Sequence, residues 1–135
     1  MQADRSVLIV EDDEAVRLVL MQALESELGA TAITGADGAA ALARALRARP
    51  AVVVLDLMLP EVDGLEVARR LRADPPTATA RIVAVSAMTP SAAVRERALA
   101  AGCDAFIAKP FRIDELLAVI RGYLAEPDRE PGQVG

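Results

Sequence analysis

Acidic residues stand directly after two apolar runs of this 135-residue chain, where they could bind a metal ion or act as nucleophiles. Glu11 and Asp12 follow the run Val7–Val10, and Asp56 follows the run Val52–Leu55. Carboxylates brought together repel one another and raise each other's pKa, and a divalent cation relieves that repulsion. Carboxylate oxygens with few other ligands suit Mg²⁺, and a carboxylate can also be the nucleophile that forms an aspartyl phosphate. The three acids are therefore candidates for a Mg²⁺ site, and Asp56 is a candidate nucleophile.

Two hydrogen-bond donors stand at the ends of two further apolar runs. Ser86 follows Ile82–Val85, and Lys109 follows Ala105–Ala108. A hydroxyl and an ammonium suit the equatorial oxygens of a transferring phosphoryl group, because catalysis of that transfer is largely positioning and charge neutralisation. Taken alone, Ser86 is typical of a turn and Lys109 of a surface charge. Their shared placement at the ends of apolar runs favours a common site.

Each acidic segment also has a purely structural interpretation. The run Glu11–Glu14 is typical of the solvated first turn of a helix, where the helix dipole favours negative charge. Asp56, taken alone, could equally cap a helix or a turn. Neither interpretation accounts for acids at the ends of two separate apolar runs.

Strand and helix patterns alternate along the chain. Short apolar runs predict five strands, at Val7–Val10, Thr31–Thr34, Val52–Leu55, Ile82–Val85 and Ala105–Ala108. Helical spacing predicts five helices: Ala15 to a stop at Gly29, Gly38–Arg47 with Asp37 as N-cap, a stripe over Leu65–Leu71, Ser91–Ala101, and Ile113–Leu124. In the first helix, Val16, Val19 and Leu20 belong to the apolar side, and Arg17 is expected to point outward.

Five such units predict a doubly wound α/β fold, in which a five-stranded parallel sheet is flanked by five helices on its two faces. In these sheets polar function gathers at the carboxyl ends of the strands, where the strand order reverses. For the common order 2-1-3-4-5, that point lies between the strands that end in Glu11-Asp12 and in Asp56. Topology alone is therefore expected to bring the carboxylates together.

Composition restricts the classes of partner and compartment. The net charge is −5, from 15 basic and 20 acidic residues, so nucleic acid and anionic membranes are not expected as direct partners. Cys103 is the only cysteine, and no apolar stretch resembles a signal peptide or reaches the roughly 20 residues of a membrane span. We therefore expect a cytoplasmic protein. The chain contains no His, so any phosphohistidine must come from a partner.

Four segments together resemble the receiver domain of two-component response regulators: LIVEDDEAVR, VVVLDLMLPEVDG, IVAVSA and DAFIAKPF. The resemblance runs from about Ser6 to Leu124. It implies a receiver domain over residues 1–125. Residues 126–135 are polar, contain two prolines and lack periodicity, so we expect a flexible tail or the start of a linker there.

The resemblance implies a Mg²⁺ cofactor and a phosphoacceptor. Glu11 and Asp12 match the acidic pair, with Asp12 as the more direct metal ligand. Asp56 matches the phosphoacceptor, and the Met58 carbonyl would complete the protein part of the Mg²⁺ shell.

The resemblance also assigns residues around the phosphoryl group. Phosphoryl-binding positions match Ser86, Ala87 and Lys109, and the Lys109–Pro110 bond is expected to be cis. Phe106 matches an aromatic switch that turns inward as the Ser86 hydroxyl moves toward the phosphoryl group, although a plain core role stays open. The output face would be the fourth helix, fifth strand and fifth helix, roughly Ser91–Leu124.

Partners follow from the same resemblance. A histidine kinase or a histidine phosphotransfer protein would supply the phosphoryl group, and a downstream protein would read the result. The chain would be a monomer or a phosphorylation-dependent dimer, similar to stand-alone or hybrid-kinase receivers. It would be a signalling domain, not an enzyme, with self-catalysed phosphotransfer and slow autodephosphorylation. Glu11, Ser86 and Phe106 replace the commoner Asp, Thr and Tyr of the family, which accommodates all three.

Three other functions fit parts of the pattern. An aspartate-nucleophile phosphatase of the haloacid dehalogenase class needs a second Asp two residues after the first, where Met58 stands. A dinucleotide-binding enzyme needs a Gly-rich turn after the first strand, where Glu11-Asp12-Asp13 stands. A pseudo-receiver would bind partners without phosphorylation, and the intact Asp12, Asp56, Ser86 and Lys109 argue against it.

Overall fold

The computed structural model describes residues 6–35, 37–59, 62–87 and 92–126. Five parallel strands form a sheet in the order β2-β1-β3-β4-β5, which confirms the predicted fold class. The strands are β1 (Ser6–Val10), β2 (Thr31–Gly35), β3 (Val52–Asp56), β4 (Arg81–Ser86) and β5 (Ala105–Ala108). Each of the five predicted strands is present at its predicted place.

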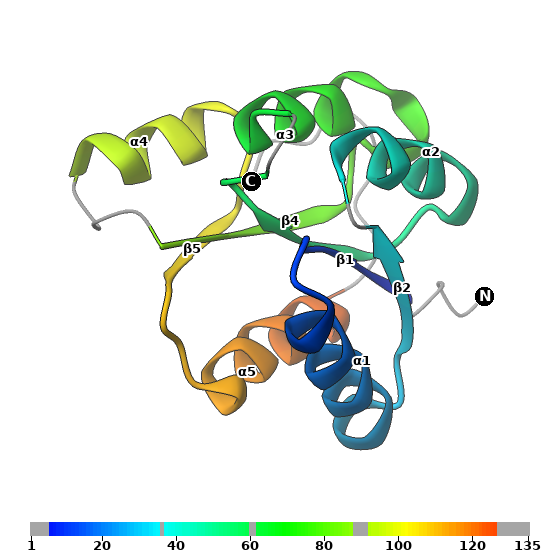
Figure 1. Ribbon diagram of the computed structural model, residues 1–135. Coiled ribbons are helices and arrows are strands. Elements are labelled where there is room, and N and C mark those ends of the chain that lie inside the picture. Colours follow the sequence, from blue (N-terminus) through cyan, green and yellow to red (C-terminus); the bar gives the residue numbers. More distant parts are fainter. Residues whose placement is uncertain (1–5, 36, 60–61, 88–91, 127–135) are drawn as a thin grey trace.

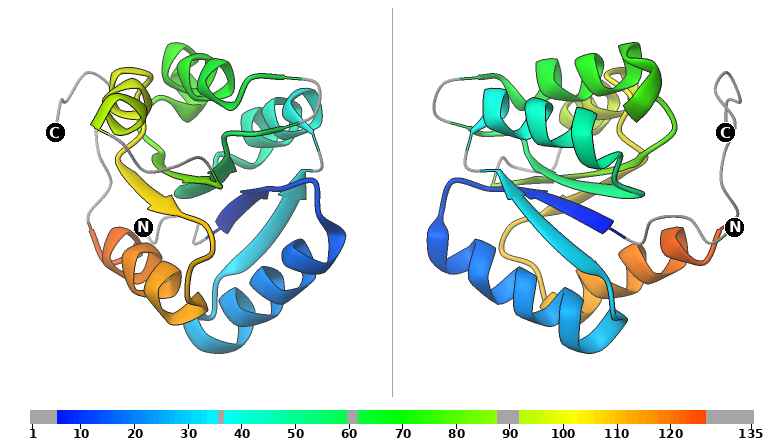
Figure 2. Two further views of the ribbon diagram at one scale, coloured as in Figure 1. Left: turned by 60° about the vertical axis from the view of Figure 1, so that its left-hand side comes forward. Right: turned by 90° about the vertical axis from the view of Figure 1, so that its right-hand side faces the viewer.

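Helices cover both faces of the sheet and form three layers with it (Figure 1). They are α1 (Glu14–Leu28), α2 (Gly38–Ala48), α3 (Gly64–Ala73), α4 (Ala92–Ala100) and α5 (Ile113–Leu124), with a 3₁₀ turn, η1, over Pro75–Thr77. Helices α1 and α5 lie on one face, and α2, α3 and α4 lie on the other; the views in Figure 2 agree. Ser91, the predicted first residue of the fourth helix, lies outside the described residues.

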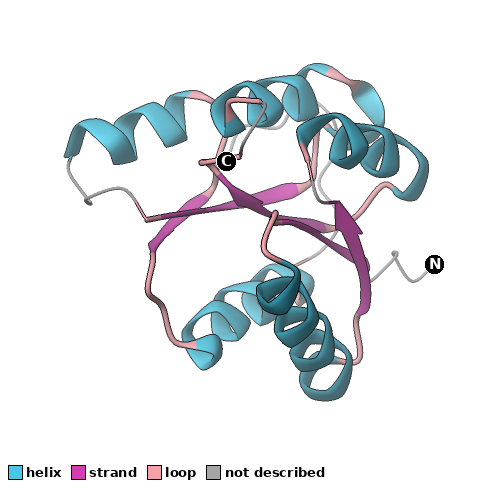
Figure 3. Ribbon diagram, viewed as in Figure 1, coloured by secondary structure: helices cyan, strands magenta, loops and turns pink. Residues whose placement is uncertain are grey.

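The central strands β1 and β3 are almost entirely apolar, as expected for a sheet that helices cover on both sides, the arrangement that Figure 3 shows. Every residue of β1 and β3 is buried. One apolar core lies between the sheet and the α2–α3–α4 layer and includes Leu8, Leu55 and Ile82. The other lies on the α1–α5 side and includes Ile9 and Ile120. The alternation of side chains along each strand thus feeds two cores and leaves the strand ends for polar residues.

Local signals begin and end the helices as the sequence predicts. Asp13 is the N-cap of α1, where its Oδ1 accepts a hydrogen bond from the Val16 amide at 3.1 Å. Gly29 ends the same helix with φ of 63°, a conformation that glycine adopts without strain. Asp37 caps α2 through a 2.8 Å bond from the Ala40 amide. Capping in the first acidic run therefore belongs to Asp13.

Two residues of α1 differ from the prediction. Val19, predicted on the apolar side, is 50% exposed, because the buried stripe of this helix is formed by Leu20 and Leu24. Arg17, predicted to point outward, is only partly exposed and hydrogen-bonds to the loop that precedes the helix. Both corrections concern the end of α1 that adjoins the acidic residues.

The described part of the chain extends one residue into the predicted tail. The Arg81 Nε donates to Glu126 Oε1 at 2.9 Å, so Glu126 still contacts the sheet, and residues 127–135 lie outside the described residues. Among the helices of the described residues, none is both long and apolar enough to cross a membrane.

Candidate functional site

The register of the sheet brings the ends of β1 and β3 together. Val10 pairs with Leu55, so Glu11 and Asp56 follow neighbouring positions on adjacent strands. One carboxylate oxygen from each of Glu11, Asp12 and Asp56 lies within 4.8 Å of the other two. The three acids that the sequence predicts to share a cation are therefore adjacent in the folded chain.

These acids differ in their access to solvent. Glu11 and Asp56 are each only 5% exposed, whereas Asp12 is exposed. Two ionised carboxylates buried side by side are unfavourable unless nearby positive charge and hydrogen bonds compensate them. The exposed Asp12 leaves the cluster open to water and to ions on one side.

Lys109 compensates the two buried carboxylates. Its Nζ donates to Glu11 Oε1 at 2.9 Å and to Asp56 Oδ2 at 3.0 Å. The residue comes directly after β5, and its amide donates to the carbonyl of Ser86 at 2.8 Å, which ties it to the end of β4. The Lys109–Pro110 peptide bond is cis.

The electrostatics of the cluster leave it short of positive charge. Burial raises the pKa of Glu11, and this effect outweighs the hydrogen bonds from Lys109 and Asp13 that lower it. Burial alone would lower the pKa of Lys109, but its hydrogen bonds to Glu11 and Asp56 outweigh burial and raise it. One ammonium therefore faces three carboxylates, and a further cation would stabilise the ionised cluster.

The donor set fits Mg²⁺. The nearby oxygens belong to carboxylates, which are the hard ligands that this ion prefers. Because Asp12 is exposed, water can reach the same place, and Mg²⁺ usually retains several waters when it binds to a few carboxylates. Glu11, Asp12 and Asp56 are the residues that would hold it.

The loop after β3 holds Asp56 in place. The Met58 amide donates to Asp56 Oδ1 at 2.9 Å, so the two oxygens of this carboxylate have different partners. The Gly64 amide donates to the Leu57 carbonyl at 3.2 Å, and a Cβ at Gly64 would lie 2.5 Å from the Leu57 Cα. Only glycine permits this close approach, which brings the start of α3 back against the loop.

The other predicted phosphoryl-binding residues lie at the end of β4. Ser86 is fully buried and pairs in register with Ala108, the residue before Lys109. Ala87 follows it and is exposed. Ser86, Ala87 and Lys109 thus lie together at the carboxyl edge of the sheet, where the acids also lie.

Phe106 lies on β5 at the edge of the core. It is partly buried and packs against the cluster beneath α2, α3 and α4. The guanidinium of Arg95, from α4, lies 5.7 Å from the centroid of the ring. The ring therefore lies between the core and a charged surface side chain of the neighbouring helix.

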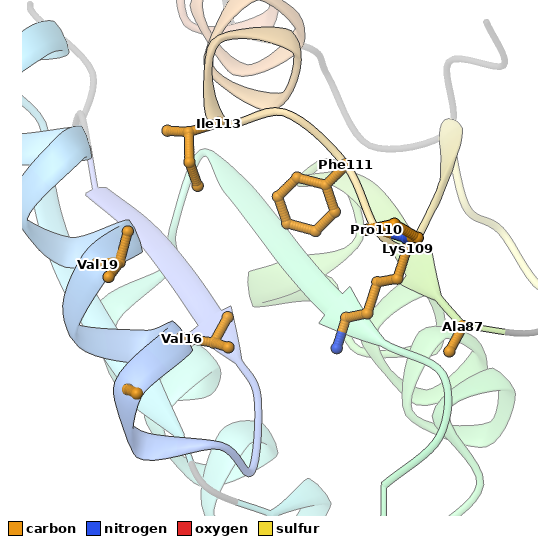
Figure 4. A pocket seen from close by; sticks show the side chains of 8 residues that line it. Val16, Val19, Ala87, Lys109, Pro110, Phe111 and Ile113 are labelled. Carbon is orange, nitrogen blue, oxygen red and sulfur yellow. The ribbon is translucent and has the colours of Figure 1, made fainter.

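An apolar groove of about 510 Å³ adjoins the carboxylate cluster. It is lined by Ala15, Val16, Val19, Ala87, Lys109, Pro110, Phe111 and Ile113. Figure 4 shows Val16 and Val19 on α1 across from Phe111 and Ile113, with the Lys109 side chain beside them. The groove thus places exposed apolar surface next to a charged site, a combination that sequence patterns did not predict.

Sequence reasoning also missed an ionic cluster at the opposite edge of the sheet. Asp104 accepts hydrogen bonds from Arg72 Nη2 at 2.6 Å, from Arg81 Nη1 at 3.0 Å and from the Ile82 amide at 2.8 Å. The only sequence signal was an acid just before an apolar run. The cluster joins α3 to the amino ends of β4 and β5, far from the acids of the site.

Comparison with known proteins agrees with this geometry. The chain matches the response regulator receiver domain family over residues 7–121. It is 39% identical over 121 residues to the probable transcriptional regulatory protein TcrX of Mycobacterium tuberculosis, covering 88% of this chain and 49% of that protein. It is 39% identical over 128 residues to the DNA-binding response regulator MtrA of the same organism, covering 95% and 54%.

The chain therefore spans about half the length of these curated relatives. The expected similarity to stand-alone or hybrid-kinase receivers stays a prediction. Among solved structures, the chemotaxis protein CheY4 of Vibrio cholerae matches with a TM-score of 0.82 and 28% identity, covering 90% of this chain and 99% of that one. Fold, strand order and family match agree, and the chain belongs to the response regulator receiver domain family.

Proposed function

We propose that this domain accepts a phosphoryl group on Asp56 in a Mg²⁺-dependent reaction and signals through the state of that residue. One observation carries the proposal: Asp56 is buried and has carboxylate oxygens of Glu11 and Asp12 within 4.8 Å and the Lys109 Nζ at 3.0 Å. A purely structural acid would gain nothing from two further acids beside it. A phosphoryl acceptor needs both the metal ligands and the cation.

The reaction uses Asp56 as the nucleophile. A carboxylate oxygen attacks the phosphorus of a phosphohistidine, the P–N bond breaks, and the imidazole leaves with the bonding electrons and takes a proton from water. When held by Glu11, Asp12 and Asp56, Mg²⁺ would neutralise negative charge on the phosphoryl group. Lys109 contributes a second positive charge, and the Met58 carbonyl is proposed as a further protein ligand to the metal. Slow hydrolysis of the resulting acyl phosphate returns the carboxylate.

Ser86 and Ala87 are proposed to bind the phosphoryl oxygens. Ser86 is the last residue of β4, and Ala87 follows it. The Lys109 amide donates a 2.8 Å hydrogen bond to the Ser86 carbonyl, which joins Ser86 to Lys109. The hydroxyl of Ser86 and the amide of Ala87 are donors of the kind that stabilise developing negative charge. We propose that the Ser86 hydroxyl moves toward the phosphoryl group to make this contact.

A partner must supply the phosphoryl group, since the chain has no His. We propose a histidine kinase or a histidine phosphotransfer protein, docked on the apolar groove beside Lys109. Lys109 lines the groove, and its Nζ donates to Asp56 Oδ2 at 3.0 Å, so a partner in the groove would lie next to the acceptor. An apolar surface there would position a donor histidine over the site and exclude water during transfer.

Output is proposed to run through Phe106. As Ser86 moves toward the phosphoryl group, the ring turns inward, and the surface of α4, β5 and α5 changes for a downstream protein. This is a shift between two populated states. Phe106 ring signals in nuclear magnetic resonance (NMR) spectra should change when beryllofluoride and Mg²⁺ are added. Unchanged ring signals would leave Phe106 as a core residue only.

Nucleic acid is not proposed as a direct partner of this domain, whose net charge is −5. Relatives named as transcriptional or DNA-binding regulators are about twice as long as this chain, so any such activity would belong to a segment beyond the match. The domain itself is proposed to act as a monomer or as a phosphorylation-dependent dimer.

Incubation with acetyl phosphate and Mg²⁺ tests the acceptor directly. Intact-mass measurement should detect one alkali-labile phosphoryl group, and chelation of Mg²⁺ should prevent its appearance. Asp56→Asn should abolish labelling. Asp114→Asn, which changes an exposed acid on α5, is the matched control and should be labelled normally. Labelling of Asp56→Asn at the normal level would refute the assignment.

A further inference from the structure

Arg17 makes an unexpected contact beside the acidic residues. Its Nη1 lies 2.7 Å from the carbonyl oxygen of Glu11 and 3.1 Å from that of Asp12. Side chains of a helix lean toward its amino end, so an arginine at the fourth position of α1 can reach the loop before Asp13. One guanidinium nitrogen therefore bridges the two peptide groups that carry the acidic pair.

The rest of this loop is held by backbone and capping contacts. The Glu11 amide donates to the Gly35 carbonyl at 3.2 Å, and the Asp13 amide donates to Glu11 Oε2 at 3.1 Å. Asp12 lies between these anchors and is exposed. The contact from Arg17 to its carbonyl joins the Asp12 peptide group to the body of α1.

We infer that Arg17 is a positioning residue for the Mg²⁺ site, because it holds the backbone that sets the directions of the Glu11 and Asp12 carboxylates. The inference rests on the proposed function only in assigning the ion as Mg²⁺. Arg17 touches neither the carboxylate oxygens nor the reacting atoms in the contacts above. Its action is on the two carbonyl groups, and through them on the side chains.

The physical basis is the narrow geometry that Mg²⁺ accepts. This ion requires nearly octahedral coordination at short distances, so small rotations of a ligand peptide lower affinity. If the loop adopts other conformations part of the time, its affinity for Mg²⁺ is multiplied by the fraction of molecules in the binding-competent conformation. Residues that orient metal ligands from the second layer typically change affinity by about 10–100-fold when removed. The effect of removing Arg17 on Mg²⁺ affinity should lie near the lower end of this range, because Asp13 also holds the loop.

Three variants separate the orienting contact from general effects of charge. Arg17→Met keeps most of the aliphatic stem and removes the donor. Arg17→Lys keeps a positive charge and one donor group, without the planar guanidinium. Arg44→Met removes an exposed arginine from α2, on the other face of the sheet, and is the matched control.

Mg²⁺ titration of ¹⁵N-labelled protein, without any phosphodonor, gives the dissociation constant from amide shifts. Arg17→Met should raise it about tenfold, Arg17→Lys should raise it less, and Arg44→Met should leave it unchanged. Amide signals of residues outside the loop report whether each variant is folded. If Arg17→Met does not fold, the dissociation constant of Arg17→Lys tests the inference instead. An unchanged dissociation constant in a folded Arg17 variant would overturn the inference.

Labelling by acetyl phosphate provides the second readout. If Arg17 acts only by positioning the metal ligands, saturating Mg²⁺ should restore the labelling rate of Arg17→Met to that of the unmodified protein. A rate that stays low at saturation would contradict a positioning role. If the unmodified protein binds Mg²⁺ but takes no phosphoryl group, the proposed function fails, while the titration still decides the role of Arg17.

Discussion

The Nζ of Lys109 lies 3.0 Å from Oδ2 of Asp56, although 53 positions separate the two residues in the chain. The same nitrogen lies 2.9 Å from Glu11 Oε1, so one ammonium bridges the ends of β1 and β3 from the end of β5. Lys109 and a bound Mg²⁺ would be attracted to the same carboxylates. Protonation of Lys109 and the ionisation of Glu11 are therefore direct measures of the charge at the site.

The titration of Lys109 should be observable on its own, because it is the only lysine in the chain. Protein labelled with ¹³C in lysine alone should give a titration midpoint above the ordinary 10.5, since hydrogen bonds to Glu11 and Asp56 outweigh burial. The associated stability is present below the ordinary pKa and is lost as pH rises through the raised one. Mg²⁺ should lower the midpoint by competing for the carboxylates. A midpoint at or below 10.5 without Mg²⁺ would contradict the geometry.

Glu11 should make the metal-free protein less stable as pH rises. Its pKa is raised above the ordinary 4.5, chiefly by burial, so the folded state binds more protons than the unfolded state from about that pH upward. Its contribution to stability is therefore largest at low pH and is lost as pH rises through the raised pKa. Glu11→Gln cannot titrate there, so its free energy of unfolding relative to the unmodified protein should increase between pH 4 and pH 7.

Urea unfolding in the presence of a chelator measures this difference, and other titrating groups cancel between the two proteins. Excess Mg²⁺ should reduce or reverse it at neutral pH, because the ion stabilises the ionised carboxylate. A difference that is constant with pH would show that burial of Glu11 does not perturb its ionisation.

Much of the fold was predictable because its signals are local. Continuous apolar runs such as Val52–Leu55 predict strands covered on both faces, and Asp37 and Gly29 mark helix ends through contacts with their own neighbours. The proximity of Glu11 and Asp56 was predictable for a different reason. Parallel strands present their carboxyl ends at one edge, so the strand order alone brings these residues together.

What the sequence did not predict depends on contacts between distant segments. Asp104 has partners 32 and 23 positions away, Arg72 and Arg81, and no short-range pattern encodes that arrangement. Arg17 occupies a helical position that faces solvent by periodicity alone, yet a long side chain can turn back to a preceding loop. The exposure of Val19 depends on which side of α1 packs into the core, and that side carries Leu20 and Leu24, which periodicity alone does not determine.

Asp104 should be a major contributor to stability without any part in phosphorylation. Its side chain is 16% exposed and pairs with Arg72 and Arg81, so Asp104→Asn leaves two guanidinium groups without their common counter-charge. We expect a loss of about 2–3 kcal/mol in urea unfolding, somewhat below the range for fully buried pairs. Glu126→Gln weakens a more exposed pair with Arg81 and should change stability by at most about 1 kcal/mol.

Labelling of folded Asp104→Asn by acetyl phosphate should be normal, since Asp104 lies at the amino ends of the strands. Equal losses of stability in Asp104→Asn and Glu126→Gln would mean that the cluster around Asp104 contributes no more to stability than a surface ion pair.

Val19 should discriminate between a small phosphodonor and a protein donor. It is 50% exposed and lines the groove, so Val19→Asp places a charge where a docked partner would cover apolar surface. Transfer from a phosphorylated histidine phosphotransfer protein should slow by about tenfold or more, because a carboxylate buried without a partner is costly. Labelling by acetyl phosphate should not change, since a small donor does not need the groove.

Leu46→Asp is the control, because Leu46 is 42% exposed on α2, away from the groove. If Val19→Asp and Leu46→Asp slow transfer from the protein donor equally, the donor does not dock on this groove. The slower transfer would then reflect a general loss of exposed apolar surface.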